Sequence, residues 1–525
     1  MPTDTPQNVA GRDLADLADQ ILGTLTARFP VCMASDEFHF FPQARADGPD
    51  WSRWDDFSPN ALADITTRFY QWRRQLEKLV SAAMPPDDIM DADMLLRVLR
   101  TLGEQLLQAG VVQTQPTFYL TIVGIGLAEA IEYGRPALTA RLQSLPGFLD
   151  QARCNLVRLP RRFRDLGIDM LARQQRWIAA LPMTPDRRTS VNNAYRRLNR
   201  HLGQTASVGE DFLPPVDWYA HVAADHMGCG CQPDDIAGEL GAEITETRSI
   251  LETSAAAMAP GHTWQTVVAN LKRPPMPAGG IGNLYHDTIA ELARHCRKQE
   301  MVSGRLLQQC PVTVQAIPDY MRPVRSNAAY SMPPGHPPHG GIFYVVETGA
   351  KASIPADHRL LTAHETFPGH HLLDTCRWGH PRPVRRHIEF PIFYEGWASF
   401  AEELMFDTGF FDGPIDRMLM AKRRFWRAMR GRIDFDIHMR RRTPDQAVAD
   451  LIAEGVAANQ AQSMIDRYCL KPGYQLAYTM GRIRFRRLYD RFGSRQPDPA
   501  GFAGRVLSQG EIGFDHLQQV LEKGG

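Results

Sequence analysis

The sequence lacks paired cysteine motifs. Its eight cysteines are scattered through 525 residues, no CxxC pair occurs, and only Cys229 and Cys231 lie close together. A disulfide framework is typical of short secreted chains with regular cysteine spacings, and this chain is neither short nor regular in that sense. We therefore expect reduced thiols that pack in the core.

Long hydrophobic runs are also missing. The most apolar run covers residues 120–128 and ends at Glu129, well short of the roughly 20 residues that a membrane-spanning helix requires. The first six residues have neither the basic nor the apolar region of a signal peptide. These features predict a cytoplasmic protein without a membrane partner.

Neither sign of charge is in excess. Lysine plus arginine and aspartate plus glutamate both number 59, so the formal net charge is zero. Nothing in this balance suggests nucleic acid or an acidic membrane surface as a partner. The chain is 43% hydrophobic and 22% charged, which is typical of a globular protein with a sizeable core.

Strand signals are scarce, particularly in the first 200 residues or so. Apolar residues there recur at the spacing of amphipathic helices. The predicted helices cover residues 11–28, 60–83, 93–110, 117–144, 147–157, 159–180 and 185–203. Alternating residues at 312–317 and 342–347 predict two strands. We predict a mainly α, two-lobed fold: an N-terminal helical lobe over residues 1–205, and a helical lobe over 206–525 that contains a small β-sheet and the chemically active residues.

Two histidines and a glutamate lie close together in the stretch 361–371, which reads L-T-A-H-E-T-F-P-G-H-H. A zinc hydrolase needs two neutral imidazoles on one metal and a carboxylate beside the attacking water. The common helical solution is H-E-x-x-H, in which both histidines share one face. Here Pro368 occupies the second histidine position, so the simple motif is interrupted.

Helix geometry restricts which later histidine can join His364. In an unbroken helix His370 would lie roughly a third of a turn off the His364 face, and His371 about 10.5 Å further along the axis. Pro368 disrupts the helix and Gly369 permits unusual backbone angles. If these two residues loop out, His370 takes the second position, so we favour it over His371 as the ligand.

A third ligand is expected from a following helix, and Glu395 is the best candidate. Glu402 lies seven residues later on the same helical face, where it is suited to support a metal ligand without binding the metal itself. Glu365, next to His364, is then the general base that takes a proton from the attacking water.

These residues resemble the bacterial "domain of unknown function 885" family of zinc metallopeptidases. Its hallmark, H-E-x-x-P-G-H-H followed by E-G-W-A, is present at 364–371 and 395–398. Residues 427–438 resemble the family's R-A-x-R and D-x-G-x-H run, and residues 467–481 resemble its R-Y…P-G-Q-A-x-x-Y-x-x-G signature. The clear match covers about residues 210–490. The resemblance implies a metallopeptidase-like helical fold and hydrolysis of peptide bonds.

The resemblance also implies roles for residues outside the ligand set. It places Arg430 near the site, where the guanidinium suits a carboxylate. Tyr478 and His438 are candidates to donate a hydrogen bond to the oxyanion of a tetrahedral intermediate. Tyr474-Gln475 stands where the family has Gln-Ala, and we expect this difference to affect substrate preference more than the metal site.

The favoured function is hydrolysis of a peptide or small amide, with one Zn²⁺ held by His364, His370 and Glu395. One alternative uses the same ligands for Fe²⁺ and oxygen chemistry, but it gives Glu365 no task. Another is a metal-free helical binding protein on the same scaffold, although every proposed ligand is present. A non-peptide amide from a specialised small-molecule pathway also fits as substrate.

Overall fold

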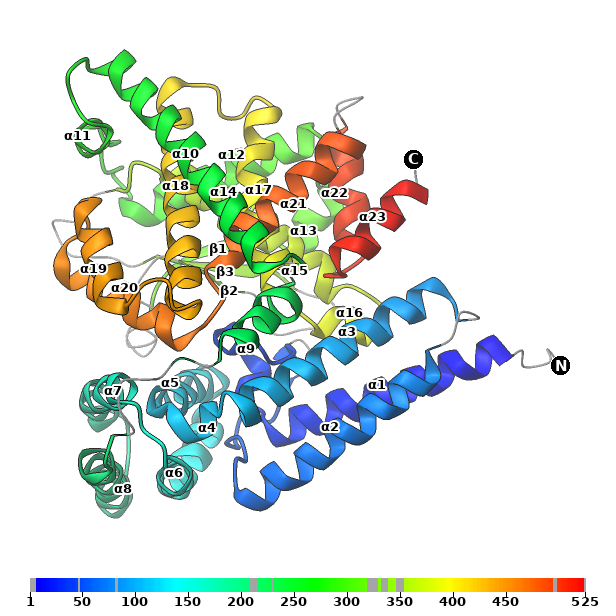
Figure 1. The fold of residues 1–525 in the computed structure, drawn as a ribbon, viewed down its shortest axis with the longest axis vertical. Coiled ribbons are helices and arrows are strands. Elements are labelled where there is room, and N and C mark those ends of the chain that lie inside the picture. Colours follow the sequence, from blue (N-terminus) through cyan, green and yellow to red (C-terminus); the bar gives the residue numbers. More distant parts are fainter. Residues whose placement is uncertain are drawn as a thin grey trace. The chain divides into compact units, whose positions relative to one another are not determined.

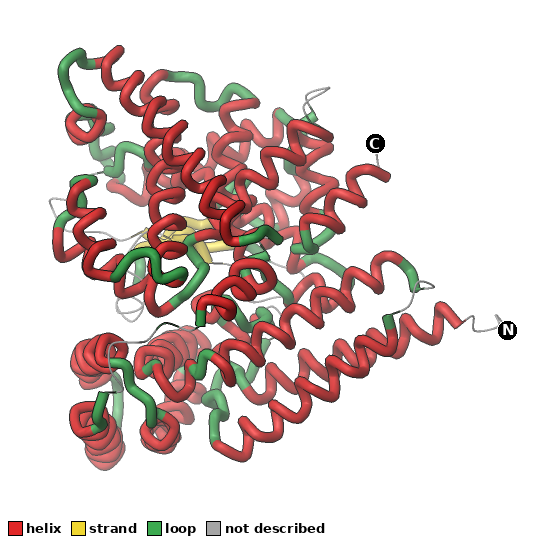
Figure 2. The backbone as a smooth tube through the Cα atoms, in the orientation of Figure 1, coloured by secondary structure: helices red, strands yellow, loops and turns green. Residues whose placement is uncertain are grey.

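The computed structural model is dominated by helices (Figures 1 and 2). It describes residues 6–45, 48–80, 84–207, 213, 215–228, 230–318, 329–331, 339–345, 354–493 and 498–523. Within these ranges strands occur in one small sheet only, so the prediction of a mainly α fold with a small sheet is confirmed. None of the helices in the same ranges is long and apolar enough to cross a membrane.

The chain divides into two compact units, and the first contains the residues up to Leu213 together with Pro381–Ile388. Its helices are α1 (Pro6–Arg28), α2 (Pro59–Leu79), α3 (Pro86–Gly103), α4 (Val111–Thr114), α5 (Pro116–Tyr133), α6 (Arg135–Asn155), α7 (Arg161–Ala179), α8 (Pro185–Gln204) and α16 (Pro383–His387). Helix α16 belongs to this unit because it is tied to α3 by ion pairs. Arg385, which is buried, contacts Asp87 at 2.6 Å and Asp91 at 2.8 Å.

Aromatic rings fill much of the core of the first unit. Phe29 stacks on Phe57 with ring centroids 5.0 Å apart, and it meets Phe41 edge to face at 5.3 Å. Phe118 of α5 meets Phe57 edge to face at 5.4 Å. Stacked and edge-to-face pairs of this kind stabilise a core beyond the area that they bury.

The single helix predicted over residues 117–144 is in fact two helices. Helix α5 ends at Tyr133, because Gly134 adopts a φ of 114°, which a residue with a Cβ rarely adopts. Helix α6 then runs through Pro146 to its end at Asn155, so the predicted break near residue 146 is also wrong. A proline removes one backbone hydrogen bond but does not always end a helix.

The second unit contains the sheet and the remaining helices. Its elements are α9 (Val216–His221), α10 (Pro233–Met258), α11 (Trp264–Ala269), α12 (Gly280–Lys298), α13 (Gly304–Gln309), β1 (Val312–Ala316), β2 (Ala329–Ser331), β3 (Gly341–Val345), α14 (His358–Glu365), α15 (His370–Trp378), α17 (Pro391–Asp407), α18 (Pro414–His438), α19 (Pro444–Ala453), α20 (Ala458–Leu470), α21 (Leu476–Phe492), α22 (Pro499–Leu507) and α23 (Phe514–Lys523). The long helices α10 and α18 lie side by side in this unit (Figure 1).

The sheet has the strand order β1-β3-β2 (yellow in Figure 2). Strand β1 pairs with β3 in parallel, with Val314 opposite Phe343, and β2 pairs with β3 antiparallel. Both predicted strands are present, although the last two residues of the predicted span 342–347 lie outside the described residues. The sequence pattern did not predict β2, which is only three residues long.

Glycines allow α17 and α21 to come into direct contact. A Cβ on Gly396 of α17 would lie 2.5 Å from the Cα of Gly481 in α21, and a Cβ on Gly481 would collide with the carbonyl oxygen of Ile392. Only glycine leaves room for the backbones to approach this closely. The close crossing brings Glu395, next to Gly396, towards Tyr478, which lies about one turn before Gly481.

Candidate metal centre

The interruption at Pro368-Gly369 acts as a two-residue insertion in the helical path. Helix α14 ends at Glu365, and α15 begins at His370. The N–H of Gly369 donates to the carbonyl of Ala363 at 3.1 Å, six residues back instead of the four of an α-helix. His370 thereby takes the place of the fourth residue after His364.

Steric fit and hydrogen bonding hold this corner in place. A Cβ on Gly369 would collide with the carbonyl oxygen of His364, so a larger residue there would force the two helical segments apart. The peptide bond between Phe367 and Pro368 is cis. The indole N–H of Trp397, which is fully buried, donates to the carbonyl of Pro368 at 2.9 Å. The E-G-W-A stretch therefore contacts the H-E-x-x-P-G-H-H stretch directly.

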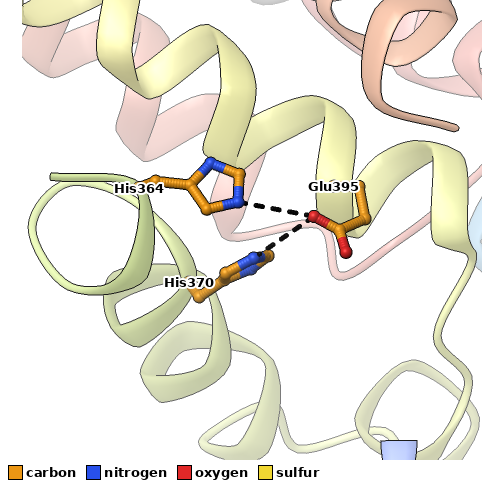
Figure 3. Close-up of side chains that lie close together, drawn as sticks. All are labelled: His364, His370 and Glu395. Atoms are coloured by element: carbon orange, nitrogen blue, oxygen red, sulfur yellow. Dashed lines mark ion pairs between the residues drawn. The ribbon is translucent and has the colours of Figure 1, made fainter. Parts of the chain in front are cut away.

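The imidazoles of His364 and His370 both point towards the carboxylate of Glu395 (Figure 3). Its Oε2 is 3.5 Å from Nε2 of each histidine, and the three candidate ligand atoms lie within 4.8 Å of one another. All three side chains are buried, and they come from α14, α15 and α17. The structure thus brings together the three residues that the sequence predicts as metal ligands.

A buried network of charges supports His364. Its Nδ1 lies 3.1 Å from Oε1 of Glu402 and 3.2 Å from Nη2 of Arg427. Glu402 is fully buried, and it accepts hydrogen bonds from Arg423 at 2.9 and 3.0 Å and from Arg427 at 2.6 Å. Partners of this kind orient a metal-binding imidazole and raise its basicity. Glu402 therefore fixes the orientation of the His364 ring.

The ring of His370 is held mainly by stacking. Tyr394 stacks on it with ring centroids 4.1 Å apart, and the hydroxyl of Tyr394 donates to Asp374 at 3.2 Å. Nδ1 of His370 is buried and has no hydrogen-bond partner within the described ranges. Sequence reasoning missed Tyr394, although its position directly before Glu395 was a usable signal.

Two tyrosines reach Glu395 from the segment around the start of α21. The hydroxyl of Tyr474 donates to Oε1 at 2.9 Å. The charge of Glu395 also acts on Tyr478, whose ring lies 6.0 Å from that of Tyr474. Oε2 of Glu395 has no hydrogen-bond partner in the described part of the chain. Tyr474, expected to affect substrate preference, therefore touches a candidate metal ligand.

Interactions within the cluster keep Glu395 ionised. Burial raises the pKa of Glu395, but the imidazoles of His364 and His370 outweigh burial and hold that pKa well below its usual range. Burial lowers the pKa of His370, and Glu395 more than offsets this, so the pKa of His370 is raised. Burial and the charge of Glu395 raise the pKa of Tyr478, so its hydroxyl keeps its proton at neutral pH.

The donor set fits a divalent metal ion. Two imidazole nitrogens and one carboxylate oxygen converge, as in the three-ligand sites of catalytic zinc. A buried carboxylate oxygen without a hydrogen-bond donor costs free energy, and Oε2 of Glu395 is such an atom. Oε2 and the two Nε2 atoms are therefore the atoms suited to hold an ion.

Two further predicted residues adjoin this cluster. Glu365 is the last residue of α14 and is half-buried. Burial lowers the pKa of His370, and the charges of Glu395 and Glu365 both raise it. The guanidinium of Arg430 lies over the ring of Tyr478, 4.8 Å from its centroid.

His438 has a different set of partners. It is fully buried, its Nδ1 lies 2.9 Å from Oδ1 of Asp434, and its ring stacks on Tyr219 at 5.0 Å. Asp434 also accepts hydrogen bonds from the backbone N–H groups of Gly473 and Gln475 at 3.0 and 3.1 Å. These contacts make His438 part of the support for the loop before α21.

His371 also makes contacts other than those of the ligand set. Its Nε2 lies 2.9 Å from the carbonyl oxygen of Cys310, and its ring meets Phe367 edge to face at 4.9 Å. Burial lowers the pKa of His371 to about 4. The ring is therefore neutral at physiological pH and donates to the Cys310 carbonyl.

Solved structures with the same fold are named as lipoproteins. A "putative lipoprotein of unknown function from Shewanella oneidensis" is 14% identical, with a TM-score of 0.74 over 99% of this chain and 100% of that chain. A "putative lipoprotein from Colwellia psychrerythraea" is 17% identical, with a TM-score of 0.77 over 98% of this chain and 99% of that chain. These identities show a shared fold alone. Among curated proteins, no match was found.

The prediction of a cytoplasmic protein is contradicted by this comparison, because both similar proteins are named as lipoproteins. That prediction rested on short apolar runs and on the composition of the first six residues. A leader is separate from the mature fold, so neither observation bears on the fold that these chains share.

The family comparison covers most of the chain. Residues 43–521 match the family described as "Bacterial protein of unknown function (DUF885)". The match includes both motifs of the metal centre and extends well beyond the span of about residues 210–490 expected from the motifs. The chain therefore belongs to the DUF885 family.

Proposed function

We propose that the chain is a metal-dependent hydrolase, with zinc as the metal, that cleaves a peptide or small amide bond. The observation that carries this proposal is the position of Oε2 of Glu395, 3.5 Å from Nε2 of both His364 and His370 and without a hydrogen-bond partner in the described ranges. Glu365 directly follows His364 at the end of α14, so a candidate general base accompanies the ligand set.

The ligands and the base have separate tasks. His364, His370 and Glu395 would hold the ion. When bound, zinc polarises the scissile carbonyl and acidifies water. Glu365 accepts a proton from the attacking water and delivers it to the nitrogen of the leaving amine.

Tyr478 is the proposed donor to the oxyanion of the tetrahedral intermediate. Its hydroxyl keeps its proton because burial and the charge of Glu395 raise its pKa. A neutral O–H beside the reacting carbonyl stabilises the charge that develops on oxygen. His438 is assigned a positioning role instead, since it contacts Asp434 and Tyr219.

The first test is the metal content of the purified protein, measured by elemental mass spectrometry without added metal. About one zinc per chain is expected. About one iron per chain, together with oxygen-dependent products, would favour the oxygenase alternative. A protein that does not bind zinc even when zinc is added would contradict the proposal.

The second test separates the base from the ligands. Glu365→Gln is expected to retain zinc and to lose turnover by about a hundredfold or more against a screen of peptides and N-acyl amino acids. Glu246→Gln is a matched control, because Glu246 lies on α10 and pairs with Arg424 in an exposed position. Full activity of Glu365→Gln would refute the assignment of the base.

A further inference from the structure

Arg430 differs from the other arginines of α18 that are at least half-buried. The others each pair with a carboxylate: Arg423 with Glu402, Arg424 with Glu243, Arg427 with Glu402 and Arg432 with Asp436. Arg430 is half-buried and has no carboxylate within ion-pair distance among the residues that the structure describes. The Nε atom of Arg430 is buried and has no hydrogen-bond partner among these described residues.

The surroundings of Arg430 place this cation beside the metal centre. Its guanidinium lies 4.8 Å from the ring centroid of Tyr478, a residue on which the charge of Glu395 acts. Arg427 lies 5.9 Å from the same ring, but its charge is already matched by Glu402. Tyr478 therefore lies next to a guanidinium that has no carboxylate partner among the described residues, and it also senses the charge of a candidate metal ligand.

An unmatched guanidinium in a half-buried position has a definite chemical preference. Removing it from water costs free energy that a cation–π contact offsets only in part. Its planar array of N–H donors matches a carboxylate, which can accept two parallel hydrogen bonds. The positive charge also attracts anions towards the site before they bind.

We infer that Arg430 binds a carboxylate of the substrate, so that the chain acts on short amides with a free α-carboxylate, such as the C-terminal residue of a peptide or an N-acyl amino acid. This inference rests on the proposed hydrolase function. In the reaction, the C–N bond breaks, the water oxygen joins the carbonyl carbon, and Glu365 passes the proton to the nitrogen of the amino acid that leaves. The α-carboxylate remains on that leaving amino acid.

Binding without turnover is the most direct test. The probes are N-acetylleucine, N-acetylphenylalanine and N-acetylglycylleucine, each as the free acid and as the C-terminal amide. Calorimetry with zinc-loaded Glu365→Gln is expected to show about tenfold to a hundredfold tighter binding of each acid, the gain of a charge-assisted hydrogen-bonded pair. Equal binding of acids and amides, or binding of none of the probes, would overturn the inference.

Variants of Arg430 distinguish it from the metal as the group that binds the acid. Introducing Arg430→Gln into the Glu365→Gln protein is expected to remove the preference for acids without changing the zinc stoichiometry. Arg430→Lys keeps the charge but not the planar fork, and it should keep part of the preference. The matched control, Arg432→Gln, removes an arginine of α18 that pairs with Asp436 and should keep the full preference. A preference that survives in Arg430→Gln would overturn the inference.

The two proposals fail differently. A wild-type chain that prefers acids through Arg430 but hydrolyses none of them would refute the hydrolase and leave the carboxylate site standing. Hydrolysis of acid and amide substrates at equal kcat/KM would refute the carboxylate site and leave the hydrolase standing.

Discussion

The hydroxyl of Tyr474 donates a hydrogen bond of 2.9 Å to Oε1 of Glu395. The other oxygen, Oε2, lies 3.5 Å from the Nε2 atoms of His364 and His370. This arrangement assigns one task to each carboxylate oxygen: Oε1 is held by the protein, and Oε2 is directed to the proposed metal position. Tyr474 is thus a positioning residue in a place where the family pattern has glutamine.

Replacing Tyr474 with phenylalanine removes this hydrogen bond and keeps the ring. We expect Tyr474→Phe to weaken zinc binding by about tenfold or more, because Glu395 loses the partner that orients it. Competition with a chelator gives the dissociation constant. Tyr468→Phe is the matched control, since the buried hydroxyl of Tyr468 has no hydrogen-bond partner within the described residues. Unchanged zinc affinity in Tyr474→Phe would show that its hydrogen bond is dispensable.

The two adjacent histidines should respond differently to substitution. His370→Gln is expected to lose zinc, whereas His371→Gln should keep the zinc stoichiometry and lower the unfolding midpoint. The reason is that His371 is fully buried and bonds to the carbonyl of Cys310 at 2.9 Å. Elemental analysis and thermal unfolding measure the two effects. Loss of zinc in His371→Gln alone would reverse the choice between them.

Glu402 should matter for both stability and metal binding. Glu402→Gln leaves the buried guanidinium of Arg427 without its carboxylate and weakens the hold on His364. Removing one partner of a buried ion pair typically costs about 3–5 kcal/mol of unfolding free energy. Urea denaturation and zinc titration should therefore both show losses. The control, Glu246→Gln, alters an exposed pair with Arg424 and should change little.

The proximity of His364 and His370 could be predicted from sequence because it depends on local spacing. His364 and His370 are six residues apart, and the Pro-Gly pair between them indicates that two residues must be looped out. The same holds for the helices, whose apolar spacing is visible over a few turns. The predicted helix boundaries were wrong where a single residue decides whether a helix ends. Gly134 ends a helix although the apolar periodicity continues past it, and Pro146 lies within a helix that it was expected to break.

Apart from the support by Glu402, the contacts around the candidate ligands could not be predicted, because they depend on how distant helices cross. Tyr474 reaches Glu395 across 79 positions of sequence, and Arg427 reaches His364 across 63. No periodicity within one helix reports which residues of another helix it will meet. That Arg430 has no carboxylate partner among the described residues is likewise visible only once the carboxylates of neighbouring helices are placed.

A buried acid in the first unit predicts a pH-dependent stability. Burial raises the pKa of Asp55 to about 7, even though backbone N–H groups of Cys32 and Val31 donate to it. Between about pH 4 and pH 7 the carboxyl of Asp55 is protonated in the folded chain and ionised in the unfolded chain. The proton that Asp55 binds therefore stabilises the folded state. This contribution to the unfolding free energy is fully present below about pH 4 and is lost as the pH rises to about 7.

Asp55→Asn should remove this dependence. The unfolding free energy of the wild type, measured relative to Asp55→Asn in urea, is expected to fall by on the order of a few kcal/mol between about pH 4 and pH 7. Above that range the difference should be constant. Parallel curves for the two proteins across this interval would show that Asp55 has an ordinary pKa in the folded state.

The glycine contact between α17 and α21 connects packing to the metal centre. In Gly481→Ala the added methyl group would meet the carbonyl oxygen of Ile392 and the Cα of Gly396, both backbone atoms that cannot turn aside. Overpacking of this kind typically costs about 1–3 kcal/mol. We expect a lower unfolding midpoint and weaker zinc binding, because the displaced α21 draws Tyr478 away from Glu395. Gly238→Ala in α10, where a Cβ meets nothing within 4 Å, is the matched control and should keep both properties. Normal zinc affinity in a destabilised Gly481→Ala would mean that the crossing serves the fold alone and that the tyrosine contacts tolerate its displacement.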